Sequence, residues 1–320
     1  MEDKNLKIHQ EHDKLFKIFF KLKETLVDYV ENFLPAEISN LIDLNSSELD
    51  DTSYITPEMK ALYSDVVHKA KFKSIQFGVK MDVPLSIAFL FDHKLVPEDY
   101  VHLQILNYKQ AIWRKDRETN NPLTFVLPII IYQGKTQWKI KPFENYFPNL
   151  PSPFLKYLPS FECHFTNAND INTSKLEKLK SILGPLFLAY KHLDDIKYLE
   201  QHLSYLFKSF EEKPNLKEIR QTFVGYVIRN AVIRSDKLKI SIEEINNSSI
   251  KSEAMTAYQS ILEEGKIEGK IEGKIEGKIE GKIELIIKAL KRGKLNTSEI
   301  AENFDVTIEF ILKLEKENGL

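Results

Sequence analysis

Three charged residues near the ends of two predicted strands provide the candidate chemistry of this chain. Asp65 lies at the head of one run of β-forming residues, and Asp92-His93-Lys94 closes a second run. Alternate side chains of a strand share a face, so Asp92 and Lys94 point the same way, about 6.7 Å apart along the backbone. The His93 side chain points to the opposite face. An acid and a base therefore face one site.

These residue types suit a site that holds a divalent cation. If Asp65 approaches from the neighbouring strand, the two carboxylates can hold a hard cation such as Mg²⁺, which prefers oxygen ligands and keeps several waters. Lys94 would then orient or help deprotonate a metal-bound water aimed at a phosphate, and would offset charge in the transition state. Burying these groups without a ligand would be costly. The alternative is that residues 92–94 begin the exposed loop after the strand.

The elements that position these residues are predicted from hydrophobic periodicity. Residues 63–72 and 83–93 form β-rich runs, which predict a hairpin with a long loop at 73–82. Pro97 starts a predicted helix that continues to about residue 115. Residues 123–132 form a near-continuous apolar run, which is typical of a strand buried on both faces.

The remaining segments complete a mixed α/β prediction. We expect one long amphipathic helix over 11–33, a polar stretch with turn chemistry at 45–53, a surface-packed loop at 143–159 and a short strand at 161–165. Residues 174–250 have helical periodicity, with Pro185 and Pro214 as breaks. The predicted fold class is α/β, with a mixed sheet flanked by helices and an all-helical C-terminal extension.

A tandem repeat is the most conspicuous internal feature. Five copies of Gly-Lys-Ile-Glu occupy residues 265–284. Each Gly costs a helix roughly 1 kcal/mol relative to Ala, and like charges recur at i, i+4, so the isolated segment is expected to be a poor helix. A face of Gly residues can let two helices approach closely, which gives the hypothesis of a homo-oligomer. The alternative is a low-complexity spacer that has no partner.

The last thirty residues predict a small helical hairpin that resembles a helix-turn-helix. Asn296 and Glu299 have the spacing of a capping box, and Thr307 can cap a second helix. A DNA-recognition helix needs side chains that reach bases and phosphates. Because the second helix carries Glu309, Glu315 and Glu317 against two lysines, an interaction or packing hairpin is favoured.

Charge and composition limit the class of protein. Lys plus Arg number 45 and Asp plus Glu 47, for a net charge of −2, so the footprint of a dedicated nucleic-acid coat protein is missing. DNA would have to be met locally. One face of the first predicted strand carries Lys69, Lys71 and Lys73, which could contact successive phosphates. The alternative is that these lysines protect an edge strand from pairing with another chain. Further cations follow on the next helix, with an aromatic ring nearby to stack: Lys109, Arg114, Lys115, Arg117 and Trp113.

The chain is expected to reside in the cytoplasm without a membrane anchor. Its one cysteine, Cys163, cannot form an intramolecular disulfide, fits a reducing compartment and is expected to be a buried small hydrophobe. The N-terminus lacks the apolar region of a signal peptide. The longest apolar run is about half of the ~20 residues that a spanning helix needs.

Five segments occur in the order of a known family's motifs. They are Glu11-His12-Asp13-Lys14-Leu15-Phe16, Tyr63-Ser64-Asp65-Val66-Val67, Phe91-Asp92-His93-Lys94, Gln104 with Tyr108, and Leu127-Pro128-Ile129-Ile130-Ile131-Tyr132-Gln133-Gly134-Lys135. Together they resemble the Rpn family of recombination-promoting nucleases, a branch of the PD-(D/E)XK nuclease superfamily. The similarity covers about residues 8–245.

The resemblance implies a fold, an activity and a set of site residues. It implies a central mixed sheet flanked by helices and Mg²⁺-dependent cleavage of DNA, with another divalent cation as an option. Asp65 and Asp92 would be metal ligands and Lys94 the catalytic lysine. Gln104 and Tyr108 would project towards the site from one helical face; the alternative is a core tyrosine with a solvated glutamine.

The match has two departures and one open assignment. The loop at 73–82 is longer than expected for the family's hairpin. The acid before His93 is Asp where many relatives have Glu, which shortens its reach to a metal. Asp13 could approach the metal, or His12 and Asp13 could cap the first helix, and we favour the cap.

The sequence therefore predicts an intracellular Mg²⁺-dependent DNA endonuclease associated with recombination or mobile elements. The alternative is a catalytically inactive nuclease-like module for DNA binding or assembly. The expected domains are a PD-(D/E)XK-like core at 1–165, a helical extension at 166–250, a repeat helix or spacer at 251–290 and the small hairpin at 291–320.

Overall fold

The computed structural model describes residues 2–50, 65–73, 75–76, 79–80, 86–179, 181–211, 213–232 and 238–319. The chain divides into two compact units, Met1–Tyr258 and Gln259–Leu320.

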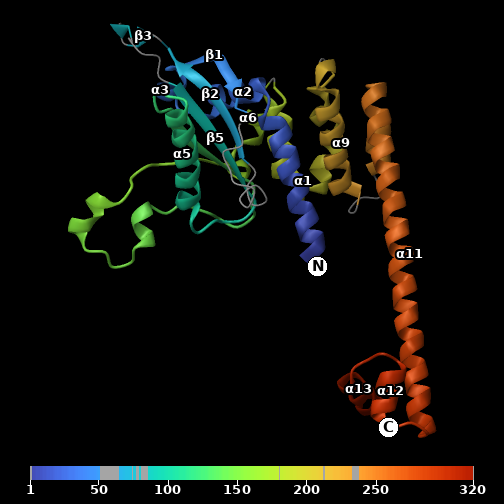
Figure 1. The fold of residues 1–320 in the computed structure, drawn as a ribbon. Coiled ribbons are helices and arrows are strands. Elements are labelled where there is room, and N and C mark those ends of the chain that lie inside the picture. Colours follow the sequence, from blue (N-terminus) through green and yellow to red (C-terminus); the bar gives the residue numbers. More distant parts are fainter. Residues whose placement is uncertain are drawn as a thin grey trace. The chain divides into compact units, whose positions relative to one another are not determined.

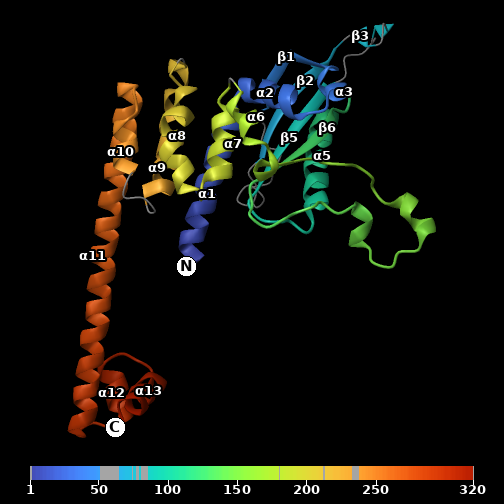
Figure 2. The same cartoon turned by 180° about the vertical axis from the view of Figure 1, so that it is seen from behind.

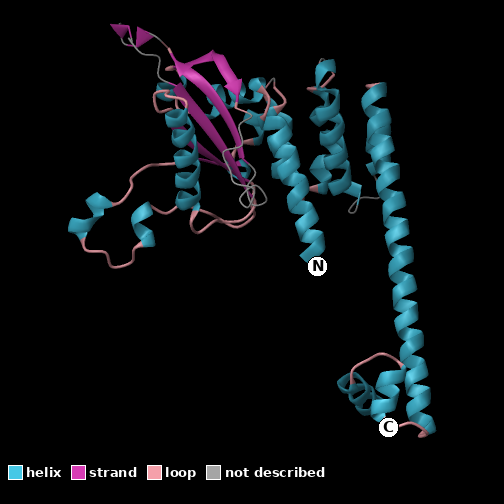
Figure 3. Ribbon diagram, viewed as in Figure 1, coloured by secondary structure: helices cyan, strands magenta, loops and turns pink. Residues whose placement is uncertain are grey.

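A five-stranded mixed sheet forms the centre of the first unit (Figure 3). Its spatial order is β1 (Ile42–Leu49), β2 (Asp65–Phe72), β5 (Ser86–Lys94), β6 (Phe125–Tyr132) and β7 (His164–Asn167). The pairs β1/β2 and β2/β5 are antiparallel, whereas β5/β6 and β6/β7 are parallel. The predicted hairpin and buried strand are confirmed. Between β2 and β5, β3 (Ile75–Gln76) and β4 (Val79–Lys80) form a separate two-stranded ladder.

Helices cover both faces of this sheet (Figures 1 and 2). On one face, which we call the α5 face, helix α5 (Val101–Glu118) packs Ile105 and Ile112 against Leu90 of β5 and other strand residues. On the opposite face, the α1 face, α1 (Glu2–Phe20) and α2 (Lys23–Phe33) pack aromatic rings on β5, where Phe91 lies 4.8 Å from Phe20. The mixed sheet flanked by helices agrees with the predicted fold class.

A helical region continues the first unit on the side of α1 and α2. It comprises α6 (Thr173–Glu177), α7 (Leu183–His192), α8 (Ile196–Lys208), η4 (Pro214–Leu216), α9 (Lys217–Val232) and α10 (Leu238–Glu243). Phe19 of α1 lies 5.5 Å from Phe223 of α9, and Phe33 of α2 lies 5.4 Å from Phe187 of α7, measured between ring centroids. The helical C-terminal region is confirmed.

The predicted single helix over 11–33 is wrong, because the chain breaks between α1 and α2. Leu22 has extended backbone angles (φ −76°, ψ 133°), and its N–H donates to the carbonyl of Phe19 at 3.1 Å. Phe19 and Phe20 before the break and Leu26 and Val30 after it are all buried. The break lets the apolar faces of both helices pack against the core. The apolar periodicity continues through the break, so the sequence alone predicts one helix.

The predicted turn region at 45–53 overlaps a strand. Residues 42–49 form β1 at the edge of the sheet, with an irregular register between Asp43 and Glu48. Within this irregularity, Ser46 Oγ donates to the carbonyl of Asp43 at 2.6 Å, and Ser47 Oγ donates to that of Leu44 at 2.7 Å. The turn chemistry is therefore that of a bulge inside a polar edge strand.

Two further boundaries and the position of one strand differ from the prediction. Helix α5 begins at Val101 rather than at Pro97, because residues 99–100 form a turn. Strand β7 lies at His164–Asn167, later than the predicted 161–165. Strand β2 is flanked on both sides, so its lysines do not blunt an edge strand.

The smaller elements are α3 (Ala36–Ser39), η1 (Phe143–Tyr146), η2 (Ser152–Tyr157) and η3 (Ala168–Asp170). The predicted surface-packed loop at 143–159 contains η1 and η2. Phe143 at its start is buried, but Phe154 and Tyr157 are exposed, so only part of this loop packs on the surface.

The second unit contains the repeat and the terminal hairpin. Helix α11 (Ser248–Arg292) is continuous through the Gly-Lys-Ile-Glu copies, although the isolated segment is expected to be a poor helix. Near its end, Ile286 packs with residues of α12 (Thr297–Asn303) and α13 (Ile308–Asn318) in a small core. The predicted capping box of Asn296 and Glu299 is present. Among the described residues, no helix has the length and apolar character needed to cross a membrane.

Candidate active site

The end of β5 places Asp92 and Lys94 on the α5 face of the sheet. Asp92 is fully buried inside the strand, and β5 continues to Lys94, so the alternative of an exposed loop from residue 92 is wrong. In the antiparallel register, the backbone of Asp65 pairs directly with that of Asp92. Paired positions of neighbouring strands belong to the same face of a sheet. Positions 65, 92 and 94 therefore share the α5 face.

The Lys94 ammonium group lies between Asp92 and helix α5. Its Nζ is 3.3 Å from Asp92 Oδ2 and donates a hydrogen bond to Gln104 Oε1 at 2.6 Å. Gln104 is 5% exposed, so the alternative of a solvated glutamine is wrong. Helix α5 thus directs a side-chain amide at the lysine that β5 presents.

The polar atoms of this cluster are only partly satisfied. Neither carboxylate oxygen of Asp92 accepts a hydrogen bond from any described residue, and the Gln104 Nε2 group is likewise buried without an acceptor there. The Lys94 ammonium group is shared, because it lies 3.3 Å from Asp92 Oδ2 and donates to Gln104 at 2.6 Å. A buried polar group without a hydrogen bond is costly, which makes this carboxylate suited to an external cation or donor.

Burial controls the acidity of Asp92. Loss of water around the carboxylate raises its pKa to about 6, and the nearby Glu98 adds to this rise. Lys94 and His93 act in the opposite direction, because their positive charge favours the ionised carboxylate. A bound cation would act in the same direction as Lys94.

The chemistry of the donors fits a hard divalent cation. Mg²⁺ is usually held by one or two carboxylates and keeps several of its waters. Among the side chains that the structure describes, no three His, Cys, Asp or Glu residues are grouped to hold a metal. The side chain of Asp65 is outside that set, so its predicted role as a second ligand depends on its backbone register alone.

Tyr108, the remaining predicted site residue, lies in the core beneath the site. It packs with Val101, Ile105 and strand residues between α5 and the sheet, and it is 4% exposed. The alternative of a core tyrosine therefore describes its packing, and its hydroxyl oxygen is buried with it.

The opposite face of β5 carries a different polar cluster, centred on His93. His93 Nδ1 is 3.2 Å from Asp13 Oδ1, and His93 Nε2 is 3.1 Å from Gln133 Oε1. The imidazole ring is stacked between Phe16 and Tyr190, at centroid distances of 4.7 and 5.7 Å. The predicted orientation of His93, away from Asp92, is confirmed.

His12 extends this cluster to the helical region. The Tyr226 hydroxyl forms a hydrogen bond with His12 Nδ1 at 2.6 Å, and Gln133 Nε2 is 3.3 Å from the same atom. His12 and Asp13 lie inside α1, which begins at Glu2, so the favoured assignment of these two residues as a helix cap is wrong. Sequence reasoning missed Tyr226 because it is 214 positions from its partner.

Gly134 brings the ends of β5 and β6 together behind this cluster. A Cβ atom at this position would overlap the carbonyl oxygen of Leu95 and the ring of Tyr132. The carbonyl of Gly134 also accepts a hydrogen bond from Asn169 Nδ2 at 3.0 Å. Only glycine allows the two strand ends to approach this closely, which fixes Gln133 beside His93.

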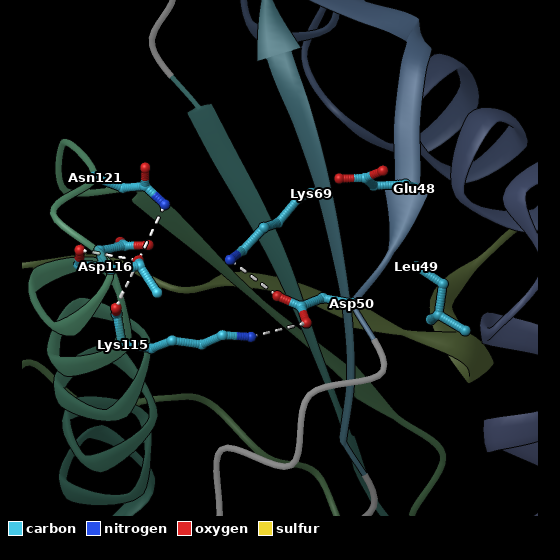
Figure 4. Close-up of a pocket in the computed structure, with 8 residues that line it drawn as sticks. Glu48, Leu49, Asp50, Lys69, Lys115, Asp116 and Asn121 are labelled. Carbon is cyan, nitrogen blue, oxygen red and sulfur yellow. Dashed lines mark hydrogen bonds and ion pairs between the residues drawn. The ribbon is translucent and has the colours of Figure 1, made fainter.

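A polar pocket lies at the other end of the α5 face (Figure 4). Its volume is about 260 Å³, and Asp50 lies within it, 2.9 Å from Lys69 Nζ and 3.9 Å from Lys115 Nζ. Asp116 Oδ2 accepts the N–H of Thr124 at 2.8 Å. The sequence prediction missed Asp50, which pairs with two of the lysines expected to meet phosphate.

The predicted basic track is therefore shorter than expected. Lys71 and Lys73 are exposed on the strand and the segment after it, and Arg114 and Arg117 are exposed on α5. Lys109 is instead 8% exposed, with its Nζ 4.0 Å from the ring centroid of Phe161.

Two other predicted side chains belong to the core rather than to a DNA surface. Trp113 Nε1 donates to the carbonyl of Thr124 at 2.8 Å, and the ring packs against the core instead of standing free to stack. Cys163 is partly buried against the same core, and burial raises its pKa to about 12, which argues against a nucleophilic thiolate.

Comparison with known proteins is consistent with a nuclease-related chain. Residues 10–220 match the family described as "Putative transposase, YhgA-like". The chain is 26% identical over 125 residues to "Recombination-promoting nuclease RpnD" of Escherichia coli O157:H7, which covers 38% of this chain and 45% of that protein. It is 28% identical over 125 residues to "Recombination-promoting nuclease RpnC" of Escherichia coli K12, which covers 39% of each. The chain thus spans less than half the length of these two relatives.

One shorter relative is matched over most of its length. The chain is 34% identical over 101 residues to "Putative inactive recombination-promoting nuclease-like protein YjiP" of Escherichia coli K12, which covers 32% of this chain and 90% of that protein. No solved structure matches the chain. The resemblance to the Rpn family expected from the motifs is confirmed.

Proposed function

Because the chain belongs to the family described as "Putative transposase, YhgA-like", we propose that it is a Mg²⁺-dependent DNA endonuclease acting in recombination or on mobile elements. Its core would be of the PD-(D/E)XK type, and its cysteine usage fits the cytoplasm. One observation carries the proposal: a fully buried carboxylate, Asp92, lies beside a partly buried lysine at the end of a central strand, and neither of its oxygens has a hydrogen-bond partner among the described residues.

Each residue of the cluster has a distinct role in this proposal. Asp92 and Asp65 would hold the cation, which supplies a Lewis acid and an activated water when bound. Lys94 would donate to a phosphate oxygen and offset the charge that develops there in the transition state. Gln104 is a positioning residue, because its amide oxygen holds the Lys94 ammonium group at 2.6 Å. Tyr108 packs α5 against the sheet beneath the site.

Exposed cations near this face would meet the DNA backbone. Lys71, Lys73, Arg114 and Arg117 are exposed on β2, the segment after it and α5. Contacts of this kind hold phosphates without reading bases. Weak sequence preference is therefore expected.

Cleavage of supercoiled plasmid by the purified full chain tests the proposal. We expect nicked or linear product with Mg²⁺, none with EDTA, and none with Asp92→Ala. Asp13→Asn, which alters the opposite face of the same strand end, is the matched control and should cleave like the wild type. Equal activity of wild type and Asp92→Ala, or no cleavage with either Mg²⁺ or Mn²⁺, contradicts the proposal.

A second candidate function follows from the names of two relatives. RpnE and YjiP of Escherichia coli K12 are both named as inactive nuclease-like proteins. The corresponding proposal is a nuclease-like module that binds DNA or assembles without cutting it. It predicts salt-sensitive DNA binding and no cleavage under any metal condition.

We also propose that helix α11 is a surface for self-association. Ile267, Ile271, Ile275 and Ile279 are each about half exposed along the helix, at 51% to 54%. The intervening glycines have open space around them, which would let a second helix approach closely. Light scattering on the chain with these four isoleucines changed to Gln should give a smaller mass than the wild type; an unchanged mass contradicts self-association here.

A further inference from the structure

The segment between β6 and β7 includes an arm, residues 135–160, that exposes several aromatic side chains. The arm stands out from α5 in both views of the fold (Figures 1 and 2). Phe147 is 44% exposed, Phe154 is 55% exposed and Tyr157 is 75% exposed. Large exposed apolar side chains that occur together on one segment mark an interaction surface more often than chance exposure.

The base of the arm is fixed to α5 close to the candidate active site. Phe143 is buried and packs on His102 at a centroid distance of 5.8 Å, and the Tyr146 hydroxyl is 3.0 Å from His102 Nδ1. His102 precedes Gln104, which holds Lys94, by two residues. The base of the arm therefore packs on the first turns of α5, which also present Gln104 to Lys94.

The backbone of the arm is restricted. Five prolines occur within it, at positions 142, 148, 151, 153 and 159. Proline fixes φ, and restricting a segment before binding reduces the entropy that it loses on binding. Asn149 turns the arm with a left-handed backbone, at φ 68°. The exposed rings therefore lie on a segment whose backbone loses little conformational entropy when a partner binds.

The charge of the arm indicates the kind of partner. It contains four lysines and one glutamate, whereas the whole chain has a net charge of −2. Lys135 pairs with Asp194 at 2.5 Å, but Lys139 and Lys141 are exposed, and no ion pair links them to a carboxylate in the described part of the chain. Lys156 Nζ lies 5.2 Å from the ring centroid of Tyr157. Exposed rings interleaved with unneutralised cations suit single-stranded nucleic acid, in which bases stack on rings while lysines follow the phosphates.

We propose that this arm binds unpaired bases of DNA, through stacking on Phe147, Phe154 and Tyr157, and delivers single-stranded or locally opened strands to the neighbouring site. The inference depends on the proposed function for the identity of the substrate as DNA. Bases in an intact duplex are already stacked on one another, so their faces are closed to these rings. The arm therefore confers a preference for single strands and forks over duplex DNA.

Binding of fluorescently labelled DNA to the full chain in EDTA tests this inference without cleavage. Three probes of one sequence are compared by anisotropy: single strand, duplex and a fork with unpaired arms. We expect the wild type to prefer the single strand and the fork. The double variant Phe154→Ala/Tyr157→Ala should bind them at least about tenfold more weakly, since stacking on each ring contributes strongly to binding, with little change for the duplex.

Two controls separate stacking from folding and from general hydrophobicity. Phe125→Ala removes an aromatic ring that is 57% exposed at the start of β6, the other end of the strand from the site, and should leave binding unchanged. Phe154→Leu/Tyr157→Leu keeps apolar side chains but removes the rings, and should lose binding as the alanine variant does. Equal affinity of the wild type for single strand and duplex, or wild-type binding by both arm variants, overturns the inference.

The remaining outcomes distinguish this inference from the proposed function. If the arm variants have a smaller mass than the wild type in light scattering but bind DNA as the wild type does, the arm is a self-association surface and the inference is overturned. Asp92-dependent plasmid cleavage combined with neutral arm variants would leave the proposed function standing and reject the arm. Arm-dependent binding to single strands without any cleavage would support the arm and reject the endonuclease.

Discussion

The two faces of the end of β5 treat their buried polar groups in opposite ways. On the α1 face, both ring nitrogens of His93 have partners, Asp13 and Gln133, and the contacts continue through His12 to Tyr226. On the α5 face, one residue earlier in the chain, the fully buried Asp92 carboxylate accepts no hydrogen bond from the described residues.

This difference separates a structural cluster from a site prepared for a ligand. A satisfied buried network holds its elements together, and here it ties α1, β5, β6 and α9 at one place. An unsatisfied buried carboxylate costs stability, and such costs are tolerated where function requires them. The account therefore expects changes on the α5 face to affect chemistry, and changes on the α1 face to affect stability.

The largest effect is expected from removing the positive charge of Lys94 on the α5 face. Lys94→Gln keeps a hydrogen-bonding side chain of similar length but removes the charge that would face a phosphate. We expect the cleavage rate at saturating Mg²⁺ to fall by about 10²- to 10³-fold, as when one preorganised donor is removed from a catalytic site. Time courses of plasmid cleavage measure this rate.

Lys115→Gln is the control for Lys94→Gln. Lys115 belongs to the same face but lies in the Asp50 pocket, 3.9 Å from Asp50 Oδ1. Its cleavage rate should stay within a few-fold of the wild type, and circular dichroism should show that both variants fold. Equal losses in the two variants would remove the distinction between the site and the pocket.

The second effect concerns the dependence of stability on pH. The pKa of Asp92 is raised from 3.8 to about 6, mainly by burial. The unfolded chain therefore loses this proton at a lower pH than the folded protein does. The stabilisation of the protonated group is fully present below about pH 3.8 and is lost as pH rises through about 6.

Asp92→Asn keeps a neutral side chain at every pH and so avoids this loss. In EDTA, we expect its free energy of unfolding to exceed that of the wild type by on the order of 1 to 3 kcal/mol at about pH 7.5, relative to the difference at about pH 4.5. Urea denaturation at the two pH values measures the change. A difference that is the same at both pH values, or larger at low pH, would show that the buried carboxylate carries no such cost.

The smallest effect is expected on the α1 face. Tyr226→Phe removes the hydroxyl that is hydrogen-bonded to His12 Nδ1 at 2.6 Å. We expect a loss of roughly 1 to 2 kcal/mol in the free energy of unfolding, because a buried hydrogen bond is broken. The cleavage rate per folded molecule should not change. Tyr100→Phe, which removes a hydroxyl from a side chain that is 59% exposed, should change neither quantity.

A fall in the cleavage rate of Tyr226→Phe, with no loss of stability, would contradict the division between the two faces. The His93 cluster would then act on the chemistry through β5.

The sequence was sufficient to predict the residues whose neighbours are local. Asp92 and Lys94 alternate at the end of an apolar strand, so their shared face follows from the pleat, and the buried strand β6 follows from its apolar run. Asn296 and Glu299 likewise form their capping box within one turn. In each case the sequence pattern that supports the prediction lies within a few residues.

The remaining features depend on contacts that sequence periodicity does not contain. Strand β1 is a polar edge strand with a bulge. Its serines are also typical of turns, so the sequence predicts a turn at this place. The sequence favours His12 as a helix cap, because its partners Tyr226 and Gln133 are both far away along the chain. Asp50 directly follows β1, and it lies beside Lys115 because α5 packs on the sheet there. The two residues are far apart in sequence, so their spacing does not predict the pair.

Calorimetric titration of the full chain with Mg²⁺ tests the central claim most directly, because it needs neither DNA nor turnover. The account predicts that the wild type and Asp13→Asn bind Mg²⁺ with the same affinity, while Asp92→Asn binds at least about tenfold more weakly, since a buried carboxylate ligand is lost. Binding by Asp92→Asn with the affinity of the wild type would contradict the claim that the α5 face of β5 holds the metal.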